Sequence, residues 1–254
     1  MSAMNILVVG QTGQMGQVLT ETIQTTPHRL VAGIGHTDNK SNSDERLYSH
    51  FTDIPASTKI DVIIDFSSPQ LLESLLQFAV DRHIPTVIAT TGIEEVEMIE
   101  KASQTIPIIY AGNYSLGINI MEKIAESVAR TLKEFDIEIT ETHHNLKVDA
   151  PSGTAHMLFN AVNRGRDHQL KQNVARHGLD AKRQKNEVGM HALRGGTVVG
   201  AHTVSFFGPD EVIELTHTAY SKQIFAHGSL KAAEFIVNQK SGLYNMDDVL
   251  EVEK

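Results

Sequence analysis

Short apolar runs alternate with longer amphipathic stretches over the first 111 residues. The apolar runs are the expected strands, at residues 6–9, 30–34, 62–65, 86–89 and 108–111. Between them, apolar residues recur every three or four positions, which predicts helices over residues 15–24, 70–82 and 94–104. Because the runs are apolar throughout, both faces of each strand are expected to be buried, as in a parallel sheet covered by helices.

The pattern changes after residue 111, which indicates a second architecture. Helices are expected over residues 117–133 and 155–163, with a half-buried strand over 136–141. Alternating β-branched positions predict three strands of an antiparallel or mixed sheet, at residues 188–193, 198–207 and 212–219. A last helix is expected over 222–239. The polar stretch 37–59 is expected to be mostly loop, and 164–185 to be irregular.

Composition excludes several classes of function. The chain has 254 residues, of which 41% are hydrophobic, enough for one large domain or two modest ones. Its net charge of −9 would repel nucleic acid and anionic membranes, so neither is an expected partner. The absence of cysteine excludes thiol nucleophiles and thiolate metal sites, and with them a phosphorylating semialdehyde dehydrogenase.

The first residues lead directly into a strand pattern, without the basic and apolar regions of a signal peptide. No segment reaches the roughly 20 apolar residues that a membrane span needs. We therefore expect a soluble cytoplasmic protein.

Three glycines follow the first expected strand and open the first helix. Gly10 permits a tight turn, Gly13 lets a pyrophosphate approach the backbone, and Gly16 allows close helix packing. Thr12 stands where the commonest dinucleotide motif has its second glycine. The turn predicts a dinucleotide site, and the alternative is a strand-to-helix turn that binds no cofactor.

The end of the second expected strand bears on the choice of cofactor. A carboxylate there would favour NAD, and a basic residue would favour the 2′-phosphate of NADP. No acid occurs until Asp38, whereas His36 and Lys40 are nearby, which favours NADPH. The alternative is that His36 and Lys40 lie in a solvated loop.

Residues 141–155 place two histidines, a lysine and a Ser-Gly-Thr turn close together. Histidine exchanges protons near neutral pH, and lysine can hold or protonate an anion. The turn after Pro151 is typical of a helix start, capped by Ser152 or Thr154, whose N–H groups can bind a carboxylate. The run predicts a catalytic loop followed by an anion-binding turn.

His143 and His144 are adjacent, so in an extended segment their side chains point in opposite directions. We favour His143 as the residue that faces the reacting centre, because it shares parity with Glu141 and Lys147 if the segment stays extended. The alternatives are metal ligation or a purely structural role. No HExxH or comparable spacing is present, and we expect no metal.

The run resembles the signature of the 4-hydroxy-tetrahydrodipicolinate reductase family, also called dihydrodipicolinate reductases, of bacterial lysine biosynthesis by the diaminopimelate route. Other motifs extend the resemblance over essentially the whole chain, at residues 10–16, 65–67, 89–92, 113–117, 194–200 and 241–244. It implies an α/β fold with a Rossmann-like parallel-sheet nucleotide domain, residues 1–113 and 224–254. The implied substrate-binding and oligomerisation domain, residues 114–223, is α+β with a mixed sheet, through which the family forms homotetramers.

The resemblance also implies the reaction, in which NADPH or NADH reduces the dehydrated form of 4-hydroxy-tetrahydrodipicolinate to tetrahydrodipicolinate. His143 and Lys147 correspond to the acid/base pair, and our hypothesis is that Lys147 is the principal proton donor. The implied contacts to the substrate dicarboxylate are His144, Lys147, Ser152, Gly153 and Thr154. The implied cofactor contacts are Gly10, Gly13, Gln14, Met15, Gly16, His36, Phe66, Thr90, Thr91, Gly92, Asn113 and Tyr114.

Three positions depart from the family pattern. Gln14 replaces a frequent arginine, Gly112 replaces the usual proline, and Lys222 stands where an arginine may occur. The first change removes a cation that could meet the cofactor phosphates, so we expect use of both NADH and NADPH.

Two other functions stay open from the sequence. One is reduction of another small carboxylated imine or carbonyl. The other is a non-catalytic dinucleotide sensor, which has no need of His143, Lys147 and a carboxylate-binding turn together.

Overall fold

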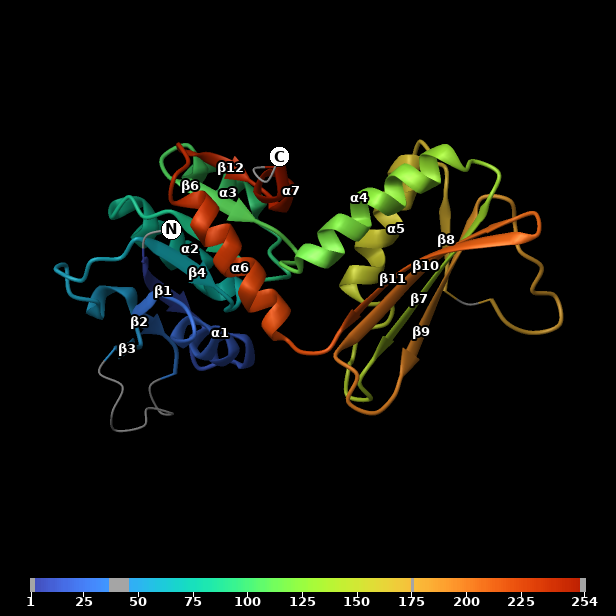
Figure 1. The fold of residues 1–254 in the computed structure, drawn as a ribbon. Coiled ribbons are helices and arrows are strands. Elements are labelled where there is room, and N and C mark those ends of the chain that lie inside the picture. The colour runs from blue at the N-terminus through green and yellow to red at the C-terminus, as the bar shows by residue number, and fades with distance from the viewer. Residues whose placement is uncertain (1–2, 37–45, 175, 252–254) are drawn as a thin grey trace. The chain divides into compact units, whose positions relative to one another are not determined.

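The computed structural model describes residues 3–36, 46–174 and 176–251. The chain divides into two compact units, a first unit of Met1–Leu116 with Lys222–Lys254 and a second unit of Gly117–Ser221 (Figure 1). The assignment of cofactor binding and substrate binding to the two expected domains stays a prediction.

The first unit contains, within the described residues, a seven-stranded parallel sheet in the order β12-β6-β5-β4-β1-β2-β3. Its strands are β1 (Asn5–Val9), β2 (Arg29–Ile34), β3 (Leu47–Tyr48), β4 (Val62–Asp65), β5 (Thr86–Ile88), β6 (Pro107–Tyr110) and β12 (Gly242–Tyr244). Its helices are α1 (Gln14–Gln24), α2 (Leu72–Asp81), α3 (Val96–Ser103), α6 (Gln223–Ile236) and α7 (Met246–Glu251), with 3₁₀ turns at Phe51–Asp53 and Pro69–Leu71. The predicted Rossmann-like parallel sheet is confirmed.

Helices cover both faces of this sheet, which is why its strands are apolar throughout. Successive side chains of a strand point to opposite faces. Ile6 and Val8 of β1 pack in one buried cluster with side chains of α1 and α6. Leu7 and Val9 pack in another cluster with side chains of α2 and α3. The central strand thus lies between two hydrophobic layers.

Two short strands of the first unit were not expected from the hydrophobic pattern. β3 lies within the stretch predicted to be mostly loop, and it pairs only with Gly33 and Ile34 of β2. β12 follows α6 and pairs with β6 at the opposite edge. A strand of two or three residues is too short to display a period of two, so only its pairing reveals it.

The second unit holds a mixed sheet of five strands, counted over the described chain, in the order β11-β10-β7-β9-β8. The strands are β7 (Asp136–His143), β8 (Lys171–Asn173), β9 (Glu187–Arg194), β10 (Gly200–Gly208) and β11 (Glu211–Ala219). β10 runs antiparallel to β7 and β11, whereas β7, β8 and β9 are mutually parallel. The predicted mixed sheet is confirmed, but β8 corrects the expectation that 164–185 is irregular. Its polar residues pair through the backbone and give no apolar alternation.

The helices of the second unit, α4 (Leu116–Thr131) and α5 (Gly153–Gly165), lie together on one face of the mixed sheet (Figure 1). Gly165 allows this close packing, because a Cβ there would lie 2.4 Å from the carbonyl oxygen of Glu126 on α4. The opposite face has no helix over it in the described chain. Phe207 and Val212, which pair across β10 and β11, are 41% and 50% exposed on that face.

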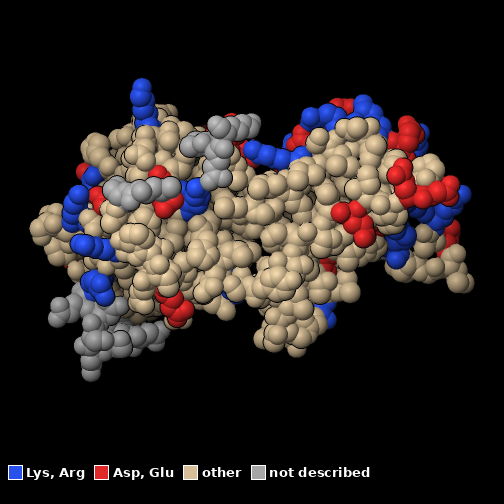
Figure 2. Space-filling model, viewed as in Figure 1, with Lys and Arg blue, Asp and Glu red and all other residues tan. Residues whose placement is uncertain are grey.

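Charged side chains of opposite sign lie close together on the helices of the second unit. Arg164 of α5 forms ion pairs with Glu122 and Glu126 of α4, and Arg130 also pairs with Glu126. The face of this unit that Figure 2 shows accordingly carries acidic and basic groups side by side rather than one patch of either sign. Within the described residues, no helix combines the length and apolar character needed to cross a membrane.

Candidate functional site

The glycine-rich turn between β1 and α1 is built so that only glycine fits at two of its positions. Gly10 has a φ of +80°, and a Cβ there would lie 2.4 Å from the carbonyl oxygen of Phe66. A Cβ at Gly16 would lie 2.0 Å from the carbonyl oxygen of Gly10. Both distances are far below van der Waals contact. The turn therefore depends on the absence of side chains at both positions.

The start of α1 fits the pyrophosphate of a dinucleotide. Gly13 is the N-cap residue, no side chain caps the helix, and its first turn contains no acidic residue. The amides around Gln14 and Met15 thus face no competing carboxylate at the positive end of the helix dipole. The predicted cofactor residues Gly10, Gly13, Gln14, Met15 and Gly16 lie together in this turn.

Lys222, at the N-cap of α6, brings an ammonium group to the same turn. Its Nζ donates a hydrogen bond to Oε1 of Gln14. From the sequence, Gln14 was expected to remove a cation from the glycine turn. The fold places a cation there from a position 208 residues later in the chain.

Thr12 links the glycine turn to the end of β2. Its Oγ1 accepts a hydrogen bond from the backbone N–H of His36 at 3.1 Å. A Cβ at Gly35 would lie 2.7 Å from the same oxygen. A threonine is therefore accommodated where a second glycine is more common. His36 is exposed beside this contact, whereas Lys40 lies outside the described residues.

Hydrogen bonds join the loops that follow β4 and β5. Oδ1 of Asp65 accepts from the backbone N–H of Ser67 at 3.1 Å and from its hydroxyl. Thr90 Oγ1 also accepts from the N–H of Ser67, at 2.9 Å. Burial raises the pKa of the Asp65 carboxyl, although hydrogen bonds from Ser67 and Thr90 oppose the shift. Asp65 thus orders the turn that contains Phe66 and ties it to Thr90.

Thr91 and Gly92 are exposed beyond this linked pair of loops. Gly92 has a φ of +75°, and a Cβ there would meet nothing within 4 Å. The backbone at this point is open to a ligand. A pocket of about 450 Å³ adjoins it, lined in part by Gly92, Pro69 and Met98.

Asn113 and Tyr114 have structural partners of their own. Oδ1 of Asn113 accepts from the N–H of Ser115 at 2.8 Å. Tyr114 is 2% exposed, and its hydroxyl donates to the carbonyl of Ile88 at 2.9 Å. Burial raises the pKa of this phenol well above its usual value. The Tyr114 ring therefore belongs to the core, and its predicted contact with a cofactor would have to involve the backbone.

Strand register in the second unit assembles a polar cluster around the end of β7. In that register, Arg194 of β9 lies opposite His143, and His202 of β10 lies opposite Glu141. Glu141 and His143 are both buried on the same side of β7, as their predicted shared parity requires. The cluster thus combines two predicted neighbours with two residues from other strands.

Lys147 does not continue the alternation of β7, and this part of the parity argument was wrong. The strand ends at His143, and the backbone N–H of Lys147 donates to the carbonyl of His144 in a turn. The Nζ of Lys147 instead forms an ion pair with Asp149 at 2.7 Å, which lowers the pKa of the Asp149 carboxyl. Backbone hydrogen bonds from Gly195 to His143 and from Asn145 to Gly196 hold the chain at the start of this turn.

The Glu141 carboxylate is the centre of the cluster. Arg194 donates to both of its oxygens, at 2.7 and 2.8 Å, and His143 Nδ1 lies 2.6 Å from Oε2. The backbone N–H of Ser152 donates to Oε1 at 3.1 Å. Burial alone would raise the pKa of this carboxyl, but the hydrogen bonds from Arg194 and His143 lower it. The group is an ionised, fully buried carboxylate.

Ser152 caps α5, as predicted, and also contacts the cluster. Its Oγ accepts from the N–H of Ala155 at 3.2 Å and lies 3.0 Å from Nε2 of His202. Burial, with a smaller contribution from the neighbouring His143, lowers the pKa of His202 to about 4. His202 is therefore neutral near pH 7.

Gly153 lies at the accessible end of the predicted anion-binding turn, and Thr154 follows it, partly buried. The N–H and hydroxyl of Ser152 are engaged by Glu141, Ala155 and His202, which gives Ser152 a structural role besides its predicted contact with substrate. Gly153 is exposed, and a Cβ there would meet nothing within 4 Å. His144 is partly exposed one residue beyond the end of β7.

Sequence reasoning missed the roles of Arg194 and His202. Arg194 also donates to the carbonyl of Asp149, so it links the Lys147 ion pair to Glu141. The signal for Arg194 was the Arg-Gly-Gly motif at 194–196, which contributed to the family resemblance but did not indicate what the arginine does. Among the residues that the structure describes, no group of three or more His, Cys, Asp or Glu is arranged to hold a metal ion.

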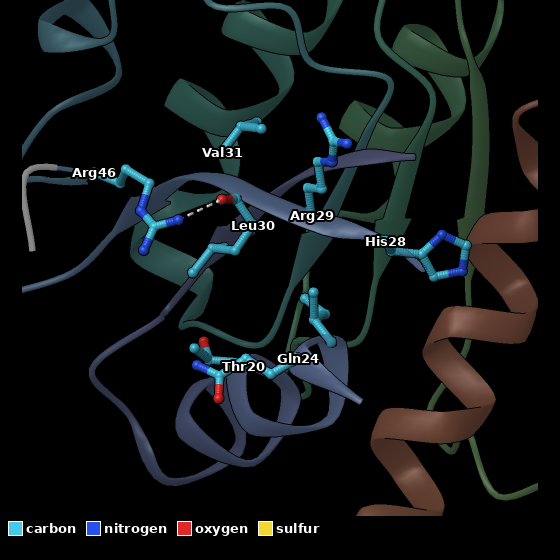
Figure 3. Close-up of a pocket in the computed structure, with 8 residues that line it drawn as sticks. Thr20, Gln24, His28, Arg29, Leu30, Val31 and Arg46 are labelled. Carbon is cyan, nitrogen blue, oxygen red and sulfur yellow. Dashed lines mark hydrogen bonds between the residues drawn. The ribbon is translucent and has the colours of Figure 1, made fainter. Parts of the chain in front are cut away.

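A separate pocket of about 510 Å³ lies between α1 and the amino-terminal half of β2 (Figure 3). Its lining includes Thr20, His28, Arg29 and Arg46, none of which was predicted as a site residue. Ligands of parallel sheets bind at the carboxyl ends of the strands, where the glycine turn lies. This pocket is therefore distinct from the candidate cofactor site.

Comparison with solved structures identifies the fold. A dihydrodipicolinate reductase from Paenisporosarcina sp. TG-14, solved with dipicolinate bound, superposes with a TM-score of 0.79 at 22% identity, covering 96% of this chain and 97% of that one. GenD2 from gentamicin A biosynthesis, solved with NAD, superposes with a TM-score of 0.62 at 10% identity, covering 99% of this chain and 91% of that one.

Comparison of sequences reaches further. The 4-hydroxy-tetrahydrodipicolinate reductase of Caldanaerobacter subterraneus subsp. tengcongensis is 42% identical over 96% of this chain and 97% of its own. That of Staphylococcus aureus is 41% identical over 97% of this chain and 100% of its own. Residues 4–114 match the family description "Dihydrodipicolinate reductase, N-terminus", and residues 117–250 match "Dihydrodipicolinate reductase, C-terminus". With both parts present in order and full-length relatives above 40% identity, the chain belongs to the dihydrodipicolinate reductase family.

Proposed function

We propose that this protein reduces the dehydrated form of 4-hydroxy-tetrahydrodipicolinate to tetrahydrodipicolinate with NADPH or NADH. The observation that carries the proposal is the cluster in the second unit, where proton-carrying groups adjoin an accessible helix start. Relatives of nearly the same length bear the name of this activity. The structural relative solved with dipicolinate favours a ring dicarboxylate as the ligand class.

The proposed division of labour follows from the chemistry of each unit. When bound, the nicotinamide supplies a hydride to an electron-poor ring carbon, and the nitrogen side of the product then needs a proton. Lys147 is the principal proton donor in this proposal, and His143 shares the acid/base work. The Asp149 carboxylate 2.7 Å from Nζ helps to hold the ammonium in place.

Substrate recognition rests on groups that suit two carboxylates. The backbone amides of Gly153 and Thr154 lie at the positive end of α5. In this proposal Lys147 and His144 add side chains that can donate hydrogen bonds to a carboxylate. Ser152 shapes this turn through its capping hydrogen bond. The placement of substrate in the second unit and cofactor in the first is part of the proposal.

Use of both cofactors is proposed from the glycine turn and the end of β2. The described part of β2 ends without an acid that would select against a 2′-phosphate, and the Lys222 ammonium lies at Gln14 in the pyrophosphate turn. We propose turnover with NADH and NADPH whose catalytic efficiencies differ by less than about 100-fold, less than 3 kcal/mol in transition-state free energy.

Assembly as a homotetramer in the cytoplasm completes the proposal. The face of the mixed sheet opposite α4 and α5 exposes Phe207 and Val212 in adjacent strands, with Thr203 and Thr216 further along. A sheet face of this kind can bury its apolar side chains against the same face of another copy.

Binding and turnover measured together test the function. Purified protein is titrated with NADH and NADPH, each with and without pyridine-2,6-dicarboxylate, and turnover of enzymatically generated substrate is followed by the loss of nicotinamide absorbance. We expect cofactor binding, dicarboxylate binding and reduction. Binding of cofactor alone would indicate a sensor, and binding of both ligands without turnover of this substrate would indicate a reductase of another carboxylated imine or carbonyl.

A further inference from the structure

The Glu141 carboxylate accepts as many hydrogen bonds as it has lone-pair positions. Oε1 accepts from Arg194 Nη2 and the N–H of Ser152, and Oε2 accepts from Arg194 Nη1 and His143 Nδ1. Two carboxylate oxygens offer about four such positions. At 1% exposure of the residue, water does not compete for them. Every donor around this group is thus matched to a negative charge.

This arrangement decides which nitrogen of His143 carries a hydrogen. An ionised carboxylate only accepts hydrogen bonds, so the 2.6 Å contact requires a hydrogen on Nδ1. Arg194 supplies the positive charge that keeps the carboxylate ionised in a buried position. Nε2 is then the nitrogen that gains or loses a proton, and it lies on the side of Gly200, where a Cβ would come within 3.1 Å of it.

We propose that Glu141 is a positioning residue, which fixes the tautomer and orientation of His143 and holds the start of α5 beside it. The proposal rests on the proposed function, in which His143 exchanges protons and the turn after Ser152 binds substrate carboxylates. One carboxylate couples these two parts, because its two oxygens receive the imidazole and the Ser152 amide respectively. Arg194 acts through Glu141 as its countercharge.

Glu141→Gln tests the hydrogen-bonding role of the carboxylate, because glutamine keeps the size of the side chain and replaces one acceptor oxygen with an NH₂ donor. The four groups around Glu141 are all donors, so the amide NH₂ of glutamine must face two of them whichever way it is turned. Turned toward His143, it forces Nδ1 to become an acceptor and moves the hydrogen to Nε2, the wrong tautomer for proton transfer at that nitrogen. Turned the other way, it opposes the Ser152 amide.

Glu138→Gln is the matched control. Glu138 lies on the same strand and is likewise held by arginine and histidine side chains, here Arg176, Arg183 and His191, whereas His143 pairs with Glu141. Glu141→Asp, which keeps the charge on a shorter side chain, is the conservative variant. All variants are made in the full chain, alongside His143→Gln.

Three measurements are made on each protein: kcat and KM, binding of NADPH and pyridine-2,6-dicarboxylate, and solid-state ¹⁵N spectra of histidine-labelled protein. For Glu141→Gln we expect kcat to fall by about tenfold or more and dicarboxylate affinity to fall as well, with the NADPH dissociation constant changed by less than about threefold. Glu141→Asp should recover part of kcat, and Glu138→Gln should retain it. The His143 signals, identified by their loss in His143→Gln, should move from a protonated Nδ1 in the wild type.

Wild-type kcat in Glu141→Gln, or His143 nitrogen signals unchanged from the wild type, would overturn the proposal. If Glu141→Gln does not fold, Glu141→Asp decides, because a shortened carboxylate that leaves both kcat and the His143 signals unaltered also overturns it. Failure of the proposed function has a different result: the wild type does not reduce the substrate, or His143→Gln is fully active. The His143 spectra still report whether Glu141 sets its tautomer in that case.

Discussion

Individual residues in the second unit owe their proposed chemistry to particular partners. Lys147 is held by Asp149, and His143 by Glu141. His202, in contrast, is neutral because it is buried and lies beside another histidine. The surroundings of each side chain, rather than its residue type alone, therefore decide its proposed role.

Removing either proposed proton donor should lower turnover without loss of cofactor. Lys147→Ala and His143→Ala are each expected to reduce kcat by on the order of 10²-fold, because each removes a group that transfers a proton in the transition state. Steady-state kinetics and NADPH titration check this. Lys185→Ala, an exposed lysine of the same unit, should behave as the wild type. Turnover near normal in both active-site variants would refute the assignment.

Acid should destabilise the protein partly through His202. Its pKa is 6.5 in the unfolded chain and about 4 in the folded protein, so between these values only the unfolded state binds the proton. Stability contributed by neutral His202 is present above pH 6.5 and is lost as the pH falls toward 4. The loss is on the order of 3 kcal/mol.

His202→Gln removes this titration while leaving an amide that can reach Ser152. We expect the stability of the wild type to fall more steeply than that of the variant between pH 6.5 and 4, as measured by urea unfolding at several pH values. Parallel curves for the two proteins would show that His202 does not carry the effect.

At the scale of elements, the start of α5 combines a helix cap with the proposed substrate site. Ser152→Ala removes the hydroxyl that caps Ala155 and contacts His202. Loss of such a cap costs about 1 kcal/mol of stability. Dicarboxylate affinity should fall as well, because the amides of the next residues lose their fixed orientation, whereas NADPH affinity should be unchanged.

Thermal unfolding and calorimetric titration with pyridine-2,6-dicarboxylate measure both effects of Ser152→Ala. Asn160→Ala, an exposed position on the same helix, is the control and should alter neither. A destabilised Ser152→Ala protein that still binds the dicarboxylate with wild-type affinity would assign the serine to folding alone.

Most helices and strands were predictable because their signals are local. The continuous apolar runs indicate strands buried on both faces, and the apolar repeat of three or four residues between them indicates helices buried on one face. β3, β8 and β12 were not predictable, since strands of two or three residues are defined by their pairing partners. The turn that takes Lys147 out of line with β7 was not predictable either, since it is held by backbone hydrogen bonds and not by a side-chain pattern.

At the scale of the whole molecule, the uncovered face of the mixed sheet predicts assembly. We expect a mass near four times the 28.0 kDa of the chain in analytical ultracentrifugation. Phe207→Glu should yield smaller species, because it places charge among side chains that another copy would bury. Asn160→Glu, on the helix-covered side, should leave the mass unchanged. A monomeric wild type, or a Phe207→Glu protein of unchanged mass, would contradict this mode of assembly.

The sequence by itself determined the parallel sheet, the glycine turn and the run at 141–155, because each is encoded by residues close together in the chain. Only the tertiary structure decided that Arg194, 53 positions from Glu141, neutralises its carboxylate, and that His202, 50 positions from Ser152, meets the cap of α5. It likewise placed Lys222 at Gln14. The physical reason is that register between strands and the return of the chain to the first unit at α6 bring distant charges together. Protonation and orientation depend on those neighbours rather than on the local sequence.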